Sequence, residues 1–388
     1  MIAADARPTK PVVKRWRAAV YLGLISSTFS TIVSQLSAAR MGRDAAVDWM
    51  SVAAIPARDW ALTAEPSSAA VAAGIAFHQW ADFSWALVFF GLFGKWTANL
   101  TPASLVLVAL PWAILTSAFE WFILVPLFPF WQPIFTLRQP YWIGFLVHFS
   151  SASMYPLFAW LRRSAAERKA FEGRTFLQIW SLGAIAGIMF LGAGALFAAR
   201  GRELPWTGRD RSIDQTFMRH MSSHHDQGVL LASIAAERAG DPHLRALSRL
   251  MVASQRGETR ILAHWWASWF EQPMPICSAE ERAAMPGLLG PAEIARLRAI
   301  EAPSFDQLFV ELMTRHHTGA VAMANSELRG GSEPRLRLMA HAIRHEQQGE
   351  IALMHGVNGA AAVHLAFQNM LADNVNHPRD GTPDRDAD

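Results

Sequence analysis

A long internal repeat limits the folds that the C-terminal half of this chain can adopt. Residues 212–258 recur at 304–350 without a gap. The shared residues are Ser212/Ser304, Asp214/Asp306, Gln215/Gln307, Phe217/Phe309, Met221/Met313, His224/His316, His225/His317, Pro242/Pro334, Leu244/Leu336, Arg245/Arg337, Gln255/Gln347, Gly257/Gly349 and Glu258/Glu350. Such a repeat is one supersecondary unit used twice. Because the shared set holds a thioether, adjacent imidazoles and a carboxylate, the repeat is also where we look for function.

Each copy of the repeat is expected to fold as a helical hairpin. Ser212 and Ser304 begin the first helices, each with a Gln in capping-box spacing. Pro242 and Pro334 open the second helices, where a missing amide costs nothing. Two hairpins with short loops predict an all-α, four-helix bundle. The expected units are a first hairpin at 209–270, a linker at 271–302, a second hairpin at 303–359 and a disordered polar tail at 374–388.

The first 200 residues hold most of the apolar side chains and predict a transmembrane helical domain. Hydrophobic residues make up 52% of the chain and charged residues only 17%. Five apolar segments come near the ~20 residues that span a bilayer core. They are Ala18–Ala38, Ser68–Phe93, Ala103–Pro129, Tyr141–Leu161 and Phe176–Ala199. The first can also be interpreted as a cleaved signal peptide, although it is longer than a usual signal core.

The basic residues predict the orientation of these segments. They form three clusters: before the first segment, between the second and third, and between the fourth and fifth. The clusters are Lys10, Lys14, Arg15 and Arg17; Lys95; and Arg162, Arg163, Arg168, Lys169 and Arg174. The positive-inside rule places all three in the cytoplasm. We therefore expect a multi-pass protein of the bacterial inner membrane, with a cytoplasmic N-terminus, a lipid-embedded first half and a periplasmic or extracellular C-terminal domain.

Four ionisable residues fall inside the predicted spans: His78, Asp82, Glu120 and His148. Such groups are costly in lipid and usually face a partner or a cavity. Three of the spans would carry a polar group at a similar depth. The set is compatible with an intramembrane metal or proton site, and equally with a hydrogen-bonded cluster that only fixes helix packing.

The spacing of methionine and histidine in the repeat favours a metal site. Met221 precedes His224 and His225 by three and four residues, so one sulfur lies a turn below two imidazoles. Soft thioethers with imidazoles suit copper, and Cu(I) above all. The predicted metal ligands are Met221, His224, His225, Glu258, Met313, His316, His317, Glu350 and Met354.

Plain core packing is the alternative interpretation of the same residues. Methionines at helical spacing commonly fill cores, and a buried histidine is often only hydrogen-bonded. The His-His pair recurs at one register in both copies, which favours ligands. Duplication, however, copies structural residues as faithfully as functional ones.

The pattern Asp-x-x-Phe-x-x-x-Met-x-x-His-His, with Gln-x-x-Glu some thirty residues later, resembles the domain of unknown function 305 family. The quoted residues are Asp214, Phe217, Met221, His224, His225, Gln255 and Glu258, then Asp306, Phe309, Met313, His316, His317, Gln347 and Glu350. The resemblance implies a ferritin-like, largely extracytoplasmic fold, with copper binding in some members. It covers Ser212–Trp269 and Ser304–Gly356 and says nothing about the first half. Repeat one departs from the pattern at Gly228 and at Leu262, where repeat two has Met354.

These observations favour a membrane-anchored extracytoplasmic protein that binds copper or confers copper tolerance. One alternative is a di-metal ferritin-like redox enzyme, but the chain lacks the Glu-x-x-His helices of di-iron ferritins, so an enzyme is the weaker interpretation. Another is a structural or partner-binding bundle with core histidines. The single Cys277 excludes an internal disulfide and a four-cysteine zinc site. The net charge of +3, with no basic stripe, gives no reason to expect nucleic acid.

Overall fold

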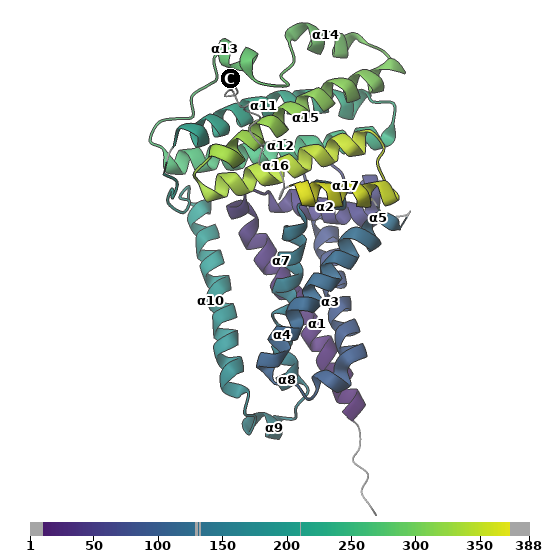
Figure 1. Cartoon of the computed structure of the whole chain (residues 1–388), viewed down its shortest axis with the longest axis vertical. Helices are drawn as coiled ribbons and strands as arrows, with labels where there is room; N and C mark the ends of the chain where they lie inside the picture. The colour runs from purple at the N-terminus through teal and green to yellow at the C-terminus, as the bar shows by residue number, and fades with distance from the viewer. Residues whose placement is uncertain (1–10, 129–130, 132, 210, 373–388) are drawn as a thin grey trace, which may run out of the picture.

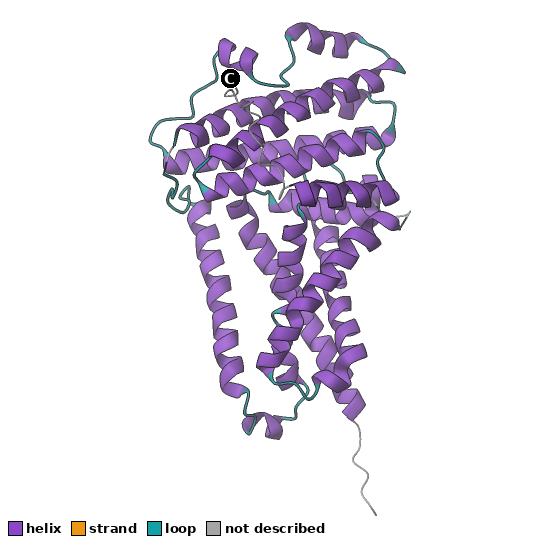
Figure 2. Ribbon diagram, viewed as in Figure 1, coloured by secondary structure: helices purple, strands orange, loops and turns teal. Residues whose placement is uncertain are grey.

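The computed structural model describes residues 11–128, 131, 133–209 and 211–372, and within them every regular element is helical (Figure 2). A group of long, steep helices lies below a stack of helices that runs across it (Figure 1). The lower group and its connections comprise α1 (Pro11–Ser37), η1 (Ala38–Met41), α2 (Ala45–Ala57), η2 (Arg58–Trp60), α3 (Ser68–Thr97), α4 (Pro102–Phe119), the π-helical turn η3 (Glu120–Leu124), α5 (Val125–Leu127), α6 (Ile134–Arg138), α7 (Tyr141–Ala152), η4 (Tyr155–Leu157), α8 (Phe158–Leu161), α9 (Ala165–Lys169) and α10 (Arg174–Ala199). Lys10 and the predicted tail at 374–388 lie outside the described residues.

The upper stack contains the two predicted hairpins. Its helices are α11 (Ser212–Arg238), α12 (Pro242–Trp269), α13 (Ala279–Ala284), α14 (Pro291–Ala299), α15 (Ser304–Gly330), α16 (Pro334–Met354) and α17 (Gly359–Ala372). Helix α11 packs along α12, α15 along α16, and α11 against α15. The apolar faces of all four helices meet in buried clusters that include Leu250, Phe309 and Met339. The bundle thus buries the apolar side of each amphipathic helix.

Acidic residues cross-link the two hairpins at their loops. Asp214 accepts hydrogen bonds from the backbone amides of Ser332 and Glu333, both at 3.1 Å. Asp306 accepts from the amides of Gly240 and Asp241, both at 2.8 Å. In an isolated helix, the amides at the start have no hydrogen-bond acceptor. Here the first helix of each hairpin supplies acceptors for the amides that precede the second helix of the other hairpin.

The predicted capping boxes at Ser212 and Ser304 are wrong, since Arg211 and Pro303 precede the helices without a side-chain cap.

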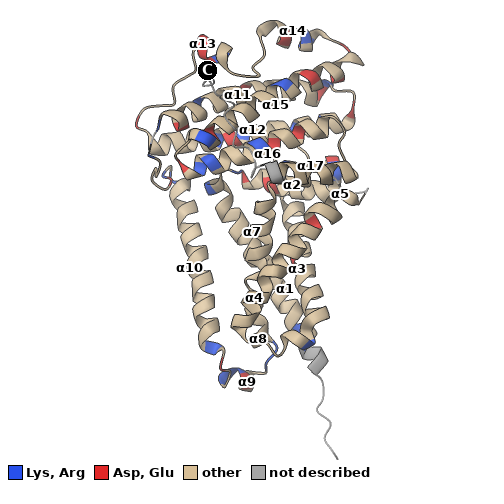
Figure 3. Ribbon diagram, viewed as in Figure 1, with Lys and Arg blue, Asp and Glu red and all other residues tan. Residues whose placement is uncertain are grey.

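Three helical stretches are long and apolar enough to cross a membrane: Arg15–Met41, Pro102–Leu127 and Arg174–Ala199. They correspond to the first, third and fifth predicted segments. The second is a continuous helix, α3, that carries His78, Asp82 and Lys95. The fourth, Tyr141–Leu161, is not one helix, since α7 ends at Ala152 and α8 begins at Phe158. Pro156 lies in the turn between them, and proline has no backbone N–H to continue a helix. Charged side chains are sparse along the steep helices (Figure 3).

Two helices that the sequence did not lead us to expect lie between the steep helices and the bundle. Helix α2 occupies the segment expected to be a loop, and Asp44 caps it through the amides of Ala46 and Val47. Helix α17 follows the second hairpin and packs on α5 and α6. Together with α6, they form the layer on which the bundle rests (Figure 1).

Candidate metal centre

The four repeated histidines lie at the middle of the bundle, where α11 faces α15. His224 and His316 come from opposite hairpins, and their ring centroids are 3.9 Å apart. His317 lies beside His316, at a centroid distance of 6.1 Å. All four imidazoles are fully buried. The structure therefore brings together the histidines of both repeats in a region closed to water.

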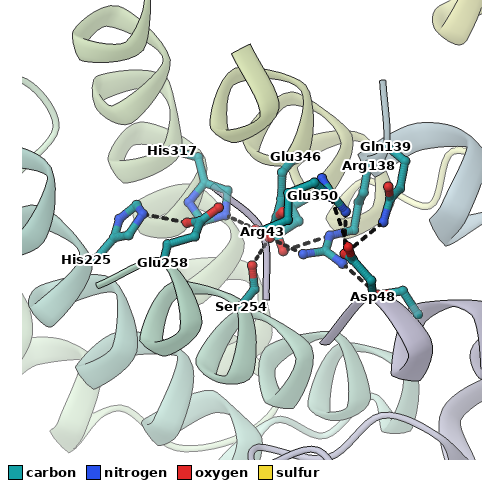
Figure 4. Close-up of polar contacts among 11 residues, drawn as sticks. Arg43, Asp48, Arg138, Gln139, His225, Ser254, Glu258, His317, Glu346 and Glu350 are labelled. Carbon is teal, nitrogen blue, oxygen red and sulfur yellow. Dashed lines mark hydrogen bonds and ion pairs between the residues drawn. The ribbon is translucent and has the colours of Figure 1, made fainter. Parts of the chain in front are cut away.

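One histidine of each pair bonds to a carboxylate of its own hairpin. The Nε2 of His225 lies 2.7 Å from Oε2 of Glu258, and the Nε2 of His317 lies 2.7 Å from Oε2 of Glu350 (Figure 4). The glutamates sit on α12 and α16, which places them beside the first helices of their own hairpins. The repeat has thus produced two equivalent histidine–carboxylate pairs.

The other histidine of each pair bonds to a backbone carbonyl. The Nε2 of His224 lies 3.2 Å from the carbonyl oxygen of Pro286, in the linker, and the Nε2 of His316 lies 3.2 Å from that of His224. A carbonyl only accepts, so each of these Nε2 atoms carries the proton. Each neutral ring then has its lone pair at Nδ1. The Nδ1 atoms of all four histidines are buried and have no hydrogen-bond partner among the described residues.

Burial keeps three of the imidazoles, those of His224, His225 and His316, neutral. It lowers the pKa of His224 to about 3 and that of His225 to about 4, and it holds the pKa of His316 well below its ordinary value. Burial and the neighbouring Glu350 raise the pKa of Glu258 to about 8. Neutral imidazole is the form that ligates metals, so this environment presents these three histidines in that form.

The structure treats the predicted sulfur ligands differently. Met221 and Met313 are fully buried, one turn before the histidines on α11 and α15. Met354 instead lines an open groove of about 690 Å³ with Asp306 and His355, and none of the four imidazoles lines it. The equivalent position in repeat one is Leu262, which is fully buried.

Among the residues that the structure describes, no three or more His, Cys, Asp or Glu side chains are arranged to hold a metal ion. That set leaves methionine out. Imidazole nitrogen and thioether sulfur, the two kinds of donor that the repeat supplies here, suit a soft ion. The chemistry of the residues present fits copper in that respect.

Arg138 is the main residue that the sequence analysis missed. It reaches from α6 into the bundle, where its Nε lies 3.1 Å from Oε1 of Glu350 and its terminal nitrogen pairs with Glu346 (Figure 4). Ser254 donates to the same Glu346 carboxylate. Burial alone would raise the pKa of Glu350, but Arg138 and His317 hold it below its ordinary value. An arginine in an otherwise apolar stretch was the available signal.

The repeated glycines mark where the lower helices press against the bundle. A Cβ on Gly257 would lie 2.8 Å from Cβ of Asp44, and one on Gly349 would overlap the backbone carbonyl of Leu137. Asp44 begins α2 and Leu137 lies in α6. Only glycine at these positions lets the two helix layers approach so closely.

The predicted intramembrane set forms two neighbouring polar groups. In one, the Nε2 of His78 lies 3.1 Å from Oγ of Ser30 and 3.5 Å from Oδ2 of Asp82. In the other, Oε2 of Glu120 accepts from Trp85 at 2.9 Å and lies 3.2 Å from Nε2 of His148. His78, Glu120 and His148 line one cavity of about 410 Å³, whereas Asp82 does not.

Comparison with known proteins finds matches to the C-terminal half of the chain. The family model described as a domain of unknown function, DUF305, matches residues 214–358. No curated protein sequence matches the chain. A DUF305 fragment from Deinococcus radiodurans is 33% identical, over 39% of this chain and 97% of that one, with a TM-score of 0.35. A DUF305 protein from Streptomyces coelicolor is 26% identical, over 38% and 96%, with a TM-score of 0.35.

A further solved relative is CopM in its Cu(I)-bound form, which is 27% identical, over 37% of this chain and 93% of that one, with a TM-score of 0.32. CopM has also been crystallised with Cu(II) and with Ag. The family match and the Deinococcus radiodurans relative establish that, through its C-terminal half, the chain belongs to the DUF305 family.

Proposed function

We propose that the chain is a membrane-anchored protein whose extracytoplasmic bundle binds copper. One observation carries the proposal: all four repeated histidines bond through Nε2 to a fixed oxygen and leave a buried Nδ1 without a partner in the described part of the chain. A ligating histidine almost always donates its other ring N–H to a carboxylate or a carbonyl, which fixes the ring and its tautomer. The rings of His224 and His316 bond to carbonyls, which fixes their tautomer, and those of His225 and His317 bond to glutamate side chains.

The neighbouring side chains favour copper among the metals. His224, His316 and the buried Met221 and Met313 would supply nitrogen and sulfur, which suit Cu(I) better than Mg²⁺ or Ca²⁺. A di-metal redox centre has less support, because Arg138 already pairs with Glu346 and Glu350. Copper is the ion to test first, since CopM has been crystallised with it.

The metal content of the purified full-length protein tests this function. We expect copper to remain bound after gel filtration and to be lost in the double variant His224→Phe/His316→Phe, which keeps two stacked rings and removes their nitrogens. His243→Phe is the matched control, because His243 lies outside the centre and bonds to Asp59. Plasma mass spectrometry gives the copper-to-protein ratio.

Wild-type protein without copper, or a double variant that keeps the wild-type ratio, would reject the proposed centre. The histidines would then be core residues whose hydrogen bonds only fix helix packing. A melting curve for each variant separates loss of copper from loss of folding, because an ion that binds only the native state raises its stability.

The membrane part of the proposal is supported by the placement of basic residues. A Cβ on Gly94, next to Lys95, would meet the Arg15 side chain, and Arg162 bonds to the carbonyl of Ala98. Arg15, Lys95 and Arg162, one residue from each basic cluster, therefore lie at one end of the steep helices, and the bundle lies at the other end (Figure 1). The positive-inside rule then puts the bundle outside the cytoplasm, whether five segments span the bilayer or fewer.

Reporter fusions test this topology. We expect alkaline phosphatase fused after the bundle, at Asn358, to be active, and the same enzyme fused between α9 and α10, at Gly173, to be inactive. Green fluorescent protein at the two sites should give the opposite result. Active phosphatase at Gly173 would overturn the orientation.

A further inference from the structure

The cavity of about 410 Å³ is built by the lower helices. Its lining comes from α1, η1, α2, α3, η3, α6, α7 and α10 and from loop residues beside them, and none of the described residues of α11–α16 contributes. At the bundle side, Arg43 and Gln139 both bond to Asp48, at 3.0 Å and 3.3 Å. The cavity therefore lies among the steep helices and their connections, apart from the histidine centre.

One wall of the cavity reaches the surface of the helices. Leu146 lines the cavity and is 45% exposed, and Leu191 of α10 also lines it. Helix α10 presents apolar side chains outward along its length, including Ile179 and Met189. In the proposed topology, that surface faces acyl chains, so the cavity is accessible to a lipid-soluble molecule. The inference rests on the proposed membrane location and is independent of copper.

The walls of the cavity suit a flat ring. Trp49, Phe77, Trp121 and Phe135 contribute aromatic faces. Gly144 holds the space next to Trp121, because a Cβ there would overlap the indole ring. Apolar and aromatic walls with a few convergent polar groups, in a volume of several hundred Å³, are typical of small-molecule sites.

The polar floor of the cavity offers an acceptor. Both donors to Glu120, the Trp85 indole and His148, meet the same oxygen, Oε2. Among the described residues, none donates to Oε1, and the side chain keeps 20% of its surface exposed where it lines the cavity. A carboxylate oxygen in this position accepts from a hydroxyl group. Oε2 of Glu120 already has two donors, so a hydroxyl ligand would add a donor to Oε1.

We propose that this cavity binds the head group of a lipid-soluble quinol, with one ring hydroxyl donating to Oε1 of Glu120. The ring lies between the aromatic walls and the tail leaves past Leu146. The reduced form is favoured over the quinone, because a quinone carbonyl cannot donate to a carboxylate.

Calorimetric titration of the full-length protein tests the site. The protein is placed in phosphatidylcholine–phosphatidylglycerol nanodiscs with a copper chelator, and empty nanodiscs give the partition background. Decylubiquinol should bind saturably, roughly tenfold more tightly than decylubiquinone, which is the effect of one hydrogen bond to a buried group. Decylbenzene, which has the tail and a ring but no oxygen, should not bind saturably.

Three variants locate the binding. Val147→Trp fills the cavity and should abolish saturable binding. Glu120→Gln should weaken quinol binding about tenfold and remove the preference for quinol over quinone, since an amide can donate to a carbonyl. Leu107→Trp, on an exposed helix face that is 76% accessible, is the control and should bind as wild type.

Heats equal to those of empty nanodiscs, or equal binding of decylubiquinol and decylbenzene, would overturn the proposal. So would wild-type affinity in a folded Val147→Trp protein. If Val147→Trp does not fold, the loss of preference in Glu120→Gln decides the matter, because a purely structural role for Glu120 would weaken both ligands alike.

Discussion

Several single residues in this protein have contacts and surroundings that their spacing in the sequence does not reveal. His224 and His316, which are adjacent to the paired His225 and His317, lie against each other across the hairpins, with their ring planes tilted by 37°. Glu327 is fully buried near the end of α15. Burial and the nearby Asp214 raise the pKa of Glu327 to about 9. The carboxyl group is therefore protonated in the folded protein at neutral pH.

Glu327 predicts how stability depends on pH. Because its pKa is higher in the folded state, its contribution is fully present below the ordinary carboxyl pKa of about 4.5 and is lost as the pH rises toward 9. We expect the free energy of unfolding to fall by about 1–3 kcal/mol between pH 5 and pH 8. Glu327→Gln, which mimics the protonated group, should flatten this part of the curve. Urea unfolding across the pH range measures it, and an unchanged slope in the variant would contradict the assignment.

At the scale of elements, the two hairpins are equal in sequence and unequal in surroundings. Gly257 and Gly349 hold equivalent places on α12 and α16, yet one meets the side chain at the start of α2 and the other meets the backbone of α6. Ser254 and Glu346 are also equivalent, and they bond to each other across the bundle. The lower helices thus make a symmetric repeat into an asymmetric domain.

Gly349→Ala separates helix propensity from packing. Alanine is about 1 kcal/mol better than glycine inside a helix, but here its methyl group would overlap the carbonyl of Leu137. Overpacking against backbone costs about 1–3 kcal/mol, so we expect a net loss of stability. Gly187→Ala on α10, where no described atom lies near the added methyl group, should not lose stability. The melting temperatures of both variants test this prediction. A higher melting temperature for Gly349→Ala than for the wild type would show that α6 can move away.

For the whole molecule, the buried charges at the junction decide how the halves hold together. Arg138 is 3% exposed and its two carboxylate partners are on the bundle, whereas Arg43 and Asp48 pair within the lower half. Figure 4 shows these side chains running from the histidine–carboxylate pairs to the start of α2. A buried charge that loses its partner is strongly destabilising, which makes Arg138 the main polar link between the halves.

Arg138→Leu should therefore cost about 3–5 kcal/mol, because it leaves Glu346 and Glu350 buried without this cation. Adding Glu346→Ser, the residue that repeat one has at this position, should restore part of the loss. Arg249→Leu is the control, since Arg249 also crosses the junction but bonds to the neutral carbonyl of Leu62. Melting curves of the purified full-length variants compare them. Equal losses for Arg138→Leu and Arg249→Leu would refute a special role for Arg138.

Much of the site was predictable because the relevant information is local. Three-and-four spacing places Met221 beneath His224 and His225 on any helix, and the repeat requires the same for Met313. The pairing of His225 with Glu258 and of His317 with Glu350 was not predicted. It depends on the register between α11 and α12 and between α15 and α16, which no periodicity within one helix contains.

The sequence by itself determined the helical class, the two hairpins and the apolar first half, because hydrophobic period, proline and glycine act over a few residues. Only the tertiary structure decided that α2 and α17 are helices, that Met354 lines a groove to which none of the four imidazoles contributes, and that Arg138 enters the bundle. The physical reason is that burial and charge pairing depend on segments far apart in the chain, such as Arg138 and Glu350. The free energy that burial and charge pairing cost or contribute depends on packing, which removes the water between these groups.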